Sequence, residues 1–305
     1  MKNQIGAMAK ELPPRNISNR LYGRLVKAEL KTNSFIMSII TISHGSYSHG
    51  KEVAEKVANR IGYDCMSREI LLDASENFNT SELMLARAIH DAPSLLDRFS
   101  GGKERYVTYV KAALLKLLRK DNVVYHGLAG HFFVQGVAHA LKVRITVDML
   151  DRVRQAMTGK NITEREAIQL LREDDKQRRR WSLWLYGHDT IDPQLYDIVL
   201  HLKRLTTDDA ADIICRTVKS DGFRTSPNSQ QQILDIALAA EVRAVLVETV
   251  PDVYVRADHG NLCIQAKVNS LAQEDFQADL TERISEVSGV GRVAVSLDPI
   301  GIFNG

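Results

Sequence analysis

The sequence has few cysteines and no long apolar run. Its three cysteines, Cys65, Cys215 and Cys263, stand far apart. An odd number at this spacing excludes a disulfide framework and a zinc-binding cysteine pattern. The longest apolar stretch near the N-terminus, residues 35–42, is much shorter than the ~20 residues of a membrane-spanning helix. No apolar signal-peptide core precedes it. We therefore expect a reduced, soluble, cytoplasmic protein without a membrane span.

The chain also lacks an excess of charge of either sign. Its 40 Lys and Arg residues against 38 Asp and Glu residues give a formal net charge of +2. Such a balance gives no overall field that would favour nucleic acid or an anionic membrane as a partner. The charge balance does not exclude small anionic ligands, because their binding needs only local positive charge. The 44% of hydrophobic residues is typical of a globular protein, and 305 residues suggest about two domains.

Strand and helix signals alternate over residues 35–220, after an N-terminal extension at 1–34. The pattern predicts strands at 35–42, 63–66, 122–126, 141–147 and 196–202, and helices at 51–61, 104–119, 163–185 and 207–219. Thr163, with Glu166 three residues later, is typical of a capped helix start. Alternation of this kind predicts an α/β fold, a parallel sheet with helices on both faces that binds ligands at the carboxyl ends of its strands.

A different pattern follows a polar linker at residues 221–229. It predicts helices at 230–248 and 271–287 and strands at 252–257, 262–268 and 291–297, with a hairpin turn at 258–261. The order αββαβ predicts a small α+β domain over residues 230–305.

A glycine-bounded loop directly follows the first strand and opens the first helix. It reads Gly45-Ser46-Tyr47-Ser48-His49-Gly50-Lys51, the G-x-x-x-x-G-K pattern of a phosphate-binding loop. We expect the glycines to let backbone N–H groups turn toward a phosphate, with Lys51 adding a mobile charge. Glu52 follows where Ser or Thr usually holds Mg²⁺. The alternative is an ordinary glycine turn between strand and helix.

A basic run lies in the polar helix after the fourth strand, from Asp175 to Trp181. Arg178 and Arg180 could close over transferring phosphates as planar forks that stabilise spreading charge. The alternative is a solvated helix face with i,i+4 pairs such as Asp174 with Arg178.

Loop, basic run and strand order together resemble the cytidylate kinase-like branch of the P-loop nucleoside monophosphate kinases. The branch pattern S-x-x-x-G-S-G-G-R-E aligns with Ser43 to Glu52, so Glu52 is usual there. The lid pattern D-K-x-R-x-R-[YW] matches Asp175 to Trp181, and a Y-D-L-V-I strand matches Tyr196 to Leu200. The resemblance runs from Ser38 to Cys215.

The resemblance implies transfer of the γ-phosphoryl group from ATP, with Mg²⁺, to a nucleoside monophosphate such as CMP or dCMP. It implies a catalytic role for Lys51, Arg178 and Arg180. The residues implied to hold the donor nucleotide are Gly45, Ser46, Tyr47, Ser48, His49, Gly50, Lys51, Glu52 and Arg152.

The implied acceptor site lies beyond the second strand, near Ser67 and Arg68. The chain departs from the family there, because Ser67 stands where the family usually has Asp. Leu128 stands where the family has an arginine that could bind acceptor phosphate. Arg105, in the inserted helical region, could substitute for it.

The C-terminal unit resembles the BON domain. The helix from Ile233 to Val247, the hairpin strands 253–257 and 262–268, and the ending Val287 to Val293, of the form V-x-G-V-x-x-V, carry this resemblance. It implies a binding or regulatory module for a small ligand, such as phospholipid, or for a protein partner. Its sheet edges are compatible with a homo-oligomer.

Three functional hypotheses stay open on the sequence. The first is a cytidylate-type kinase, the second a catalytically inactive nucleotide-binding regulator that signals through the C-terminal module, and the third a kinase of a small non-nucleotide metabolite. Histidines gather near the predicted ligand-facing loops, but Cys and carboxylate partners at ligand spacing are missing from the sequence around them. We therefore predict no metal site among the side chains.

Overall fold

The computed structural model describes residues 37–67, 102–127, 129–247, 249–268, 280, 282–284 and 286–299. The chain divides into a unit Met1–Ile36 and a unit Met37–Gly305. The first unit, with the predicted extension 1–34, lies outside the described residues, and so does most of the predicted helix 271–287. Everything below concerns the second unit.

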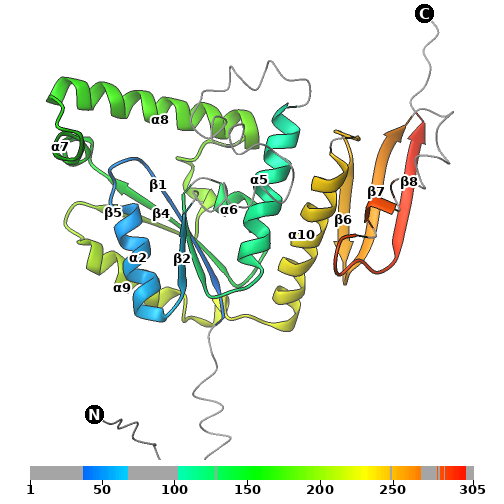
Figure 1. Ribbon diagram of the computed structural model, residues 1–305. Coiled ribbons are helices and arrows are strands. Elements are labelled where there is room, and N and C mark those ends of the chain that lie inside the picture. The colour runs from blue at the N-terminus through cyan, green and yellow to red at the C-terminus, as the bar shows by residue number, and fades with distance from the viewer. Residues whose placement is uncertain are drawn as a thin grey trace, which may run out of the picture. The chain divides into compact units, whose positions relative to one another are not determined.

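A five-stranded sheet confirms the predicted α/β class. Its strands are β1 (Ile39–His44), β2 (Asp64–Ser67), β3 (Val123–His126), β4 (Ala140–Val147) and β5 (Ile198–Leu202). They lie in the order β2-β3-β1-β4-β5, and every pair is parallel (Figure 1). β1 is central and its neighbours β3 and β4 come later in the chain. Its carboxyl end is therefore a topological switch point, where such sheets bind ligands.

Helices cover both faces of the sheet, as the sequence predicts. On one face, α2 (Gly50–Ile61) and α9 (Thr207–Thr217) bury Val53, Val57 and Ile214 against Ile40 and Ile42 of β1. The other face is covered by α5 (Gly102–Leu118), the short α6 (Gly130–Phe133) and the end of α8 (Glu164–Tyr186). Two 3₁₀ turns, η3 (Pro193–Leu195) and η4 (Asp221–Phe223), lie in the connections around β5 and α9.

The helices α7 (Met149–Lys160) and α8 pack against each other through a small core of their own. This core consists of Val153, Ala156, Ala167 and Leu171, with Tyr47 from the loop after β1 packed against it. At the start of α8, the Thr163 hydroxyl accepts from the amide of Glu166, and the Glu166 carboxylate accepts from the amide of Thr163, which confirms the capping box. Helices α7 and α8 therefore form a packed pair, which contacts the loop through Tyr47.

The C-terminal part contains a second, smaller sheet and the helix α10 (Pro227–Leu246). Its strands β6 (Tyr254–Asp258), β7 (Asn261–Val268) and β8 (Val293–Pro299) lie in that order, with β6 antiparallel and β8 parallel to β7. The predicted turn between β6 and β7 is confirmed, with His259 and Gly260 at φ 49° and 78°, as a two-residue type I′ turn requires. The likeness to a BON domain stays a prediction.

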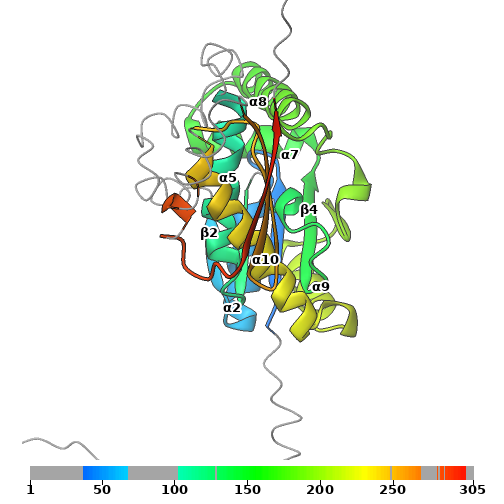
Figure 2. The same cartoon turned by 90° about the vertical axis from the view of Figure 1, so that its right-hand side faces the viewer.

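Helix α10 is shared between two cores. Ile233, Ala237 and Ala240 belong to the core that contains α5 and the large sheet. Leu238 and Val242 belong to the core of the small sheet. Figure 1 shows α10 between α5 and β6, and Figure 2 gives the view from the side of the small sheet. The small sheet is therefore attached to the large one through a helix that is buried on two sides.

The described residues contain no helix of the length and apolarity that crossing a membrane would need.

Because α10 is shared between two cores, we predict that substitutions at two neighbouring residues of α10 differ greatly in their effect on stability. Ile233 is 0% exposed and Leu234 is 39% exposed. Ile233→Ala should lower the free energy of unfolding by about 2–4 kcal/mol, because it leaves a cavity in the larger core. Leu234→Ala should change it by less than about 0.5 kcal/mol. Urea unfolding of both variants measures this. Equal losses would contradict the packing of α10 on α5.

Candidate phosphate-binding site

The loop between β1 and α2 has two residues in the left-handed backbone region. Tyr47 has φ 56° and His49 has φ 58°. This conformation costs a residue with a side chain roughly 1–2 kcal/mol, so the surroundings must hold it. In the family pattern of the sequence analysis, both positions are glycine. The chain therefore keeps a glycine-type loop conformation with bulky residues.

The glycines of the motif allow close approach of neighbouring side chains to the loop. Gly45 and Gly50 are not among the positive-φ glycines. A Cβ on Gly50 would lie 2.1 Å from the ring of His44, and a Cβ on Gly45 would lie 3.3 Å from the guanidinium of Arg152. Side chains packed on the loop therefore require glycine at its two ends.

Left-handed residues within a loop turn successive N–H groups to one side, and such a concave nest binds anions. The Ser48 hydroxyl donates to the carbonyl of Gly45 at 2.6 Å and closes the turn. Helix α2 begins at Gly50, so its positive end faces the same region. The backbone of this segment is therefore suited to bind phosphate oxygens, as the motif predicts.

Ser46 connects the loop to α7 and α8. Its hydroxyl donates to Asp174 at 2.5 Å and accepts from Arg178 at 3.0 Å. Its carbonyl accepts from Nε of Arg152 at 2.9 Å. The remaining nitrogens of Arg152 hold Asp175 in a bidentate pair at 2.8 Å each. Two arginines and two carboxylates thus meet at the loop.

The family resemblance implied that Arg152 binds the donor nucleotide. In the structure, its guanidinium group bonds to the carbonyl of Ser46 and to Asp175. Its residue exposure is only 8%. Asp174, predicted as an i,i+4 partner of Arg178, accepts a hydrogen bond from Ser46, which is distant in sequence.

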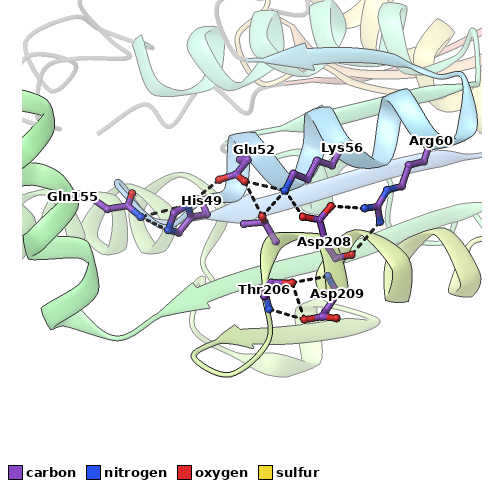
Figure 3. Close-up of polar contacts among 9 residues, drawn as sticks. His49, Glu52, Lys56, Arg60, Gln155, Thr206, Asp208 and Asp209 are labelled. Carbon is purple, nitrogen blue, oxygen red and sulfur yellow. Dashed lines mark hydrogen bonds and ion pairs between the residues drawn. The ribbon is translucent and has the colours of Figure 1, made fainter.

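Glu52 connects the loop to α9 (Figure 3). One carboxylate oxygen accepts from Thr207 at 2.7 Å and lies 3.1 Å from Lys56, and the other lies 2.9 Å from Nδ1 of His49. The amide of Gln155, from α7, contacts the ring of His49. The hydrogen bond from Thr207, followed by those from Lys56 and His49, lowers the pKa of Glu52 from 4.5 to about 2. Glu52 is therefore a structural anion.

The same network continues away from the loop. Lys56 also reaches Asp208 at 2.7 Å, and Arg60 pairs with Asp208 and Asp212 at 2.5 and 2.7 Å. These pairs fix the start of α9 to α2 and leave the loop itself to the residues around Ser46.

Lys51 and Arg180 do not contact the loop through their side chains in this structure. Lys51 is 72% exposed, and its Nζ lies 3.8 Å from Glu55. Arg180 is exposed. It lies two positions beyond Arg178 on α8, and residues at this spacing point to different sides of a helix. Their catalytic roles stay predictions, and only Arg178 of the basic run meets the loop.

The predicted acceptor residues are only partly described. Ser67 ends β2 and is paired in register with His126 of β3. Arg105 lies in the first turn of α5. Arg68 and Leu128 lie outside the described residues, and the acceptor roles stay predictions.

Polar side chains that the sequence analysis did not select gather beside the end of β1. Arg144 of β4 donates to the hydroxyls of Ser43 and Tyr196 at 3.3 Å each. The Tyr196 hydroxyl also lies 3.4 Å from Nε2 of His131. A signal existed, because Lys142 and Arg144 put charge on one face of a strand that a parallel sheet with helices on both faces should bury on both sides.

Burial keeps two imidazoles near this cluster neutral. It is the main cause that lowers the pKa of His44 to about 4, and the charges of His126, Arg178 and Arg144 act in the same direction. Burial also lowers the pKa of His131 to about 3, with Arg144 as the next cause. Neither histidine therefore adds positive charge near neutral pH.

Within the described residues, Asp235, Asp258 and His259 come close enough together to hold a metal ion. Asp235 already accepts from the backbone amides of His259 and Gly260 at 3.0 and 3.1 Å. Its position is explained by capping of the turn between β6 and β7, and exposed acidic groups of this kind are common without a metal.

Comparison with known proteins gives one family. The sequence model of the cytidylate kinase-like family matches residues 39–204, which is more than half of the chain. A search of curated protein sequences finds no match.

Solved structures give fold likeness only. An uncharacterized protein from Eubacterium ventriosum is 18% identical over 60% of this chain and 99% of its own, with a TM-score of 0.47. Shikimate kinase from Acinetobacter baumannii is 12% identical over 61% of this chain and 96% of its own, with a TM-score of 0.36. Shikimate kinase from Bacteroides thetaiotaomicron is 10% identical over 60% and 99%, with a TM-score of 0.39. At these values the likeness says nothing about substrate.

The left-handed conformation of Tyr47 can be tested by two substitutions that both remove its ring. Tyr47→Gly should be more stable than Tyr47→Ala by about 1 kcal/mol, because only glycine adopts positive φ without cost. The control is Ser46, which is not among the positive-φ residues; there Ala should be at least as stable as Gly. Urea unfolding measures all four variants. The same order at both positions would contradict the loop conformation.

The lowered pKa of Glu52 predicts a pH-dependent stability difference. A carboxyl group whose folded-state pKa lies below its ordinary value stabilises the fold above that ordinary value, here 4.5, and loses this effect as the pH falls toward 2. Glu52 is 44% exposed, so solvent screens the effect. Glu52→Gln should lower Tm at pH 7 by about 2 °C, and the difference should shrink toward zero in acid.

The matched control for Glu52 is Glu55→Gln on the same helix, because Glu55 meets only Lys51 at 3.8 Å. It should change Tm little at either pH. A Tm difference for Glu52→Gln that is the same at pH 7 and at about pH 3 would show that its carboxylate is not held in this network.

Proposed function

The chain belongs to the cytidylate kinase-like family, and on that premise we propose that it transfers the γ-phosphoryl group of ATP to a nucleoside monophosphate. CMP or dCMP is the acceptor that the family likeness favours. The observation that carries the proposal is the contact of Arg178, from α8, with Ser46 in a loop whose backbone has the conformation of an anion nest.

In the proposed reaction, an oxygen of the acceptor phosphate attacks the γ-phosphorus of ATP, and the bond from that phosphorus to the β,γ-bridging oxygen breaks. The acceptor becomes a nucleoside diphosphate and ADP leaves. An acceptor phosphate oxygen is already ionised, so this reaction needs positioning and charge stabilisation more than a general base. The loop amides and Lys51 would hold the donor phosphates, and Arg178 would stabilise the charge on the transferring group.

Two carboxylates hold polar groups at the loop in this structure. Asp174 accepts a hydrogen bond from the hydroxyl of Ser46, and Asp175 forms an ion pair with Arg152. Phosphates of ATP would therefore compete with these carboxylates for the arginines. Arg178 is already within reach of the loop, and its guanidinium would form a charge-assisted bond to a phosphate oxygen bound there.

A magnesium ion fits the oxygen donors that are present. The Ser46 hydroxyl and the Asp174 carboxylate lie 2.5 Å apart, and one or two protein oxygens beside substrate phosphates are usual for Mg²⁺. Glu52, at the position of the usual Ser or Thr, is held by Thr207 and Lys56 instead. Bound Mg²⁺ would neutralise charge on the β- and γ-phosphates.

A second candidate is a nucleotide-responsive regulator. The sharing of α10 between the core of α5 and the core of the small sheet favours it, because a movement of α5 would be transmitted to the C-terminal module. That module, which resembles a BON domain, would then bind a small ligand or a protein partner in response to ATP.

A phosphoryl-transfer assay on a panel of nucleoside monophosphates, with ATP and Mg²⁺, tests the first proposal. Wild-type protein should phosphorylate at least one acceptor. Arg178→Ala should lower kcat at least about 100-fold, because an arginine at the transferring phosphate stabilises the transition state. ATP affinity, measured by calorimetry, should fall far less.

The matched control is Arg172→Ala on the exposed face of the same helix, which should keep full activity. ATP binding without turnover of any acceptor would reject the kinase and leave the regulator. The regulator would then be tested by asking whether ATP changes the rate of proteolysis at residues 221–229.

A further inference from the structure

Arg144 differs from Arg152 and Arg60 in its partners. Arg152 holds Asp175 and Arg60 holds Asp208 and Asp212. The half-buried guanidinium of Arg144 meets two neutral hydroxyls, of Ser43 and Tyr196, and lies 5.6 Å from the centre of the Tyr196 ring. Within the described residues, no carboxylate is at ion-pair distance from it.

The partners of Arg144 are buried, neutral hydroxyl groups. Ser43 is 6% and Tyr196 is 8% exposed. The Tyr196 hydroxyl donates to the carbonyl of Thr190 at 2.9 Å, so its orientation is fixed. His131 is neutral because burial lowers its pKa to about 3. A partly desolvated cation without an anion costs free energy, and a bound anion would remove that cost.

Arg144 lies beside the carboxyl end of β1, next to the start of the phosphate-binding loop. Arg144 is paired in register with Ser43, two residues before Gly45, where the phosphate-binding loop begins. The charges of Arg144 and of Arg178 both act on His44, which lies between Ser43 and Gly45. Arg178 reaches the loop itself through Ser46. The two guanidiniums therefore approach the end of β1 from β4 and from α8.

We propose that Arg144 binds the phosphate group of the acceptor, with the hydroxyls of Ser43 and Tyr196 orienting its guanidinium. This inference rests on the proposed function and names the side chain that gives it specificity for a phosphate monoester. Because β4 and β2 lie on opposite sides of β1, this places the acceptor phosphate away from Ser67, near which the family likeness implied it. A neutral hydroxyl metabolite would leave Arg144 without an anion and is disfavoured as an acceptor.

The test separates the acceptor from the donor. Arg144→Gln should raise KM for the nucleoside monophosphate about 10- to 100-fold, the loss expected for a charge-assisted, two-point contact. KM for ATP should change less than about 3-fold. Arg144→Lys keeps the charge but loses the planar fork, so its KM for the acceptor should be intermediate. An unchanged acceptor KM in Arg144→Gln would overturn the proposal.

The matched control is Arg154→Gln on α7, whose side chain is 77% exposed and pairs with Asp151. It should leave both KM values unchanged. Tm of each variant shows whether it folds. If Arg144→Gln does not fold, the comparison of Arg144→Lys with wild type decides, since a lysine that leaves acceptor KM unchanged would contradict a role for the planar fork.

Calorimetric titration with CMP and with inorganic phosphate, in the absence of ATP, tests the inference apart from turnover. Wild-type protein should bind CMP, and Arg144→Gln should bind it at least about 10-fold more weakly. This result without turnover would reject the kinase but keep the anion site. Turnover with unaltered CMP binding in Arg144→Gln would reject the anion site but keep the kinase. Failure of wild-type protein to bind CMP or phosphate would reject the inference.

Discussion

The hydrogen bonds of Ser46 are the interactions on which the site depends. Its hydroxyl meets Asp174 and Arg178 of α8, and its carbonyl accepts from Arg152 of α7. Through these bonds a loop that follows the central strand is fixed to two helices far along the chain. The costly left-handed residues on either side of Ser48 are compensated by this attachment, because Tyr47 packs into the α7–α8 core and His49 contacts Glu52 and Gln155. A chain with glycine at both positions would need neither contact.

Two cores determine how the C-terminal part relates to this site. The face of the large sheet that α5 covers is completed by Ile233 and Ala237 of α10, whereas the opposite side of α10 supports the small sheet. Arg119 at the end of α5 also pairs with Glu241 at 3.6 Å. The small sheet is thus connected to the helix that lies beside the predicted acceptor region. Within the described residues, the small sheet adds no side chain to the contacts of the phosphate-binding loop given above.

Local patterns predicted the fold well, because each of them reports a local cause. The β-branched runs became the five parallel strands, Thr163 and Glu166 formed the capping box, and the residues around Gly260 formed the hairpin turn. The partners within the site could not be predicted in this way. Asp174 was read with Arg178, four residues away, yet it bonds to Ser46 across 128 residues. Arg144 was passed over as part of a strand, because only the fold shows that its neighbours carry no acid. The close packing of His44 on Gly50 and of Arg152 on Gly45 could not be predicted from the motif either.

Positive charge is compensated differently on the two sides of the site. On the side of the loop, Asp175 pairs with Arg152 and Asp174 takes the hydroxyl of Ser46, so carboxylates stand where phosphates would bind. On the side of β4, Arg144 donates to two hydroxyls and has no carboxylate of the described residues at ion-pair distance, and the nearby His44 and His131 are neutral because burial lowers their pKa values. An anion entering beside the loop must displace internal carboxylates, whereas an anion entering beside Arg144 displaces none. Under the proposed function, binding of the donor phosphates would therefore compete with the contacts that α7 and α8 make with the loop, and binding of the acceptor phosphate at Arg144 would not.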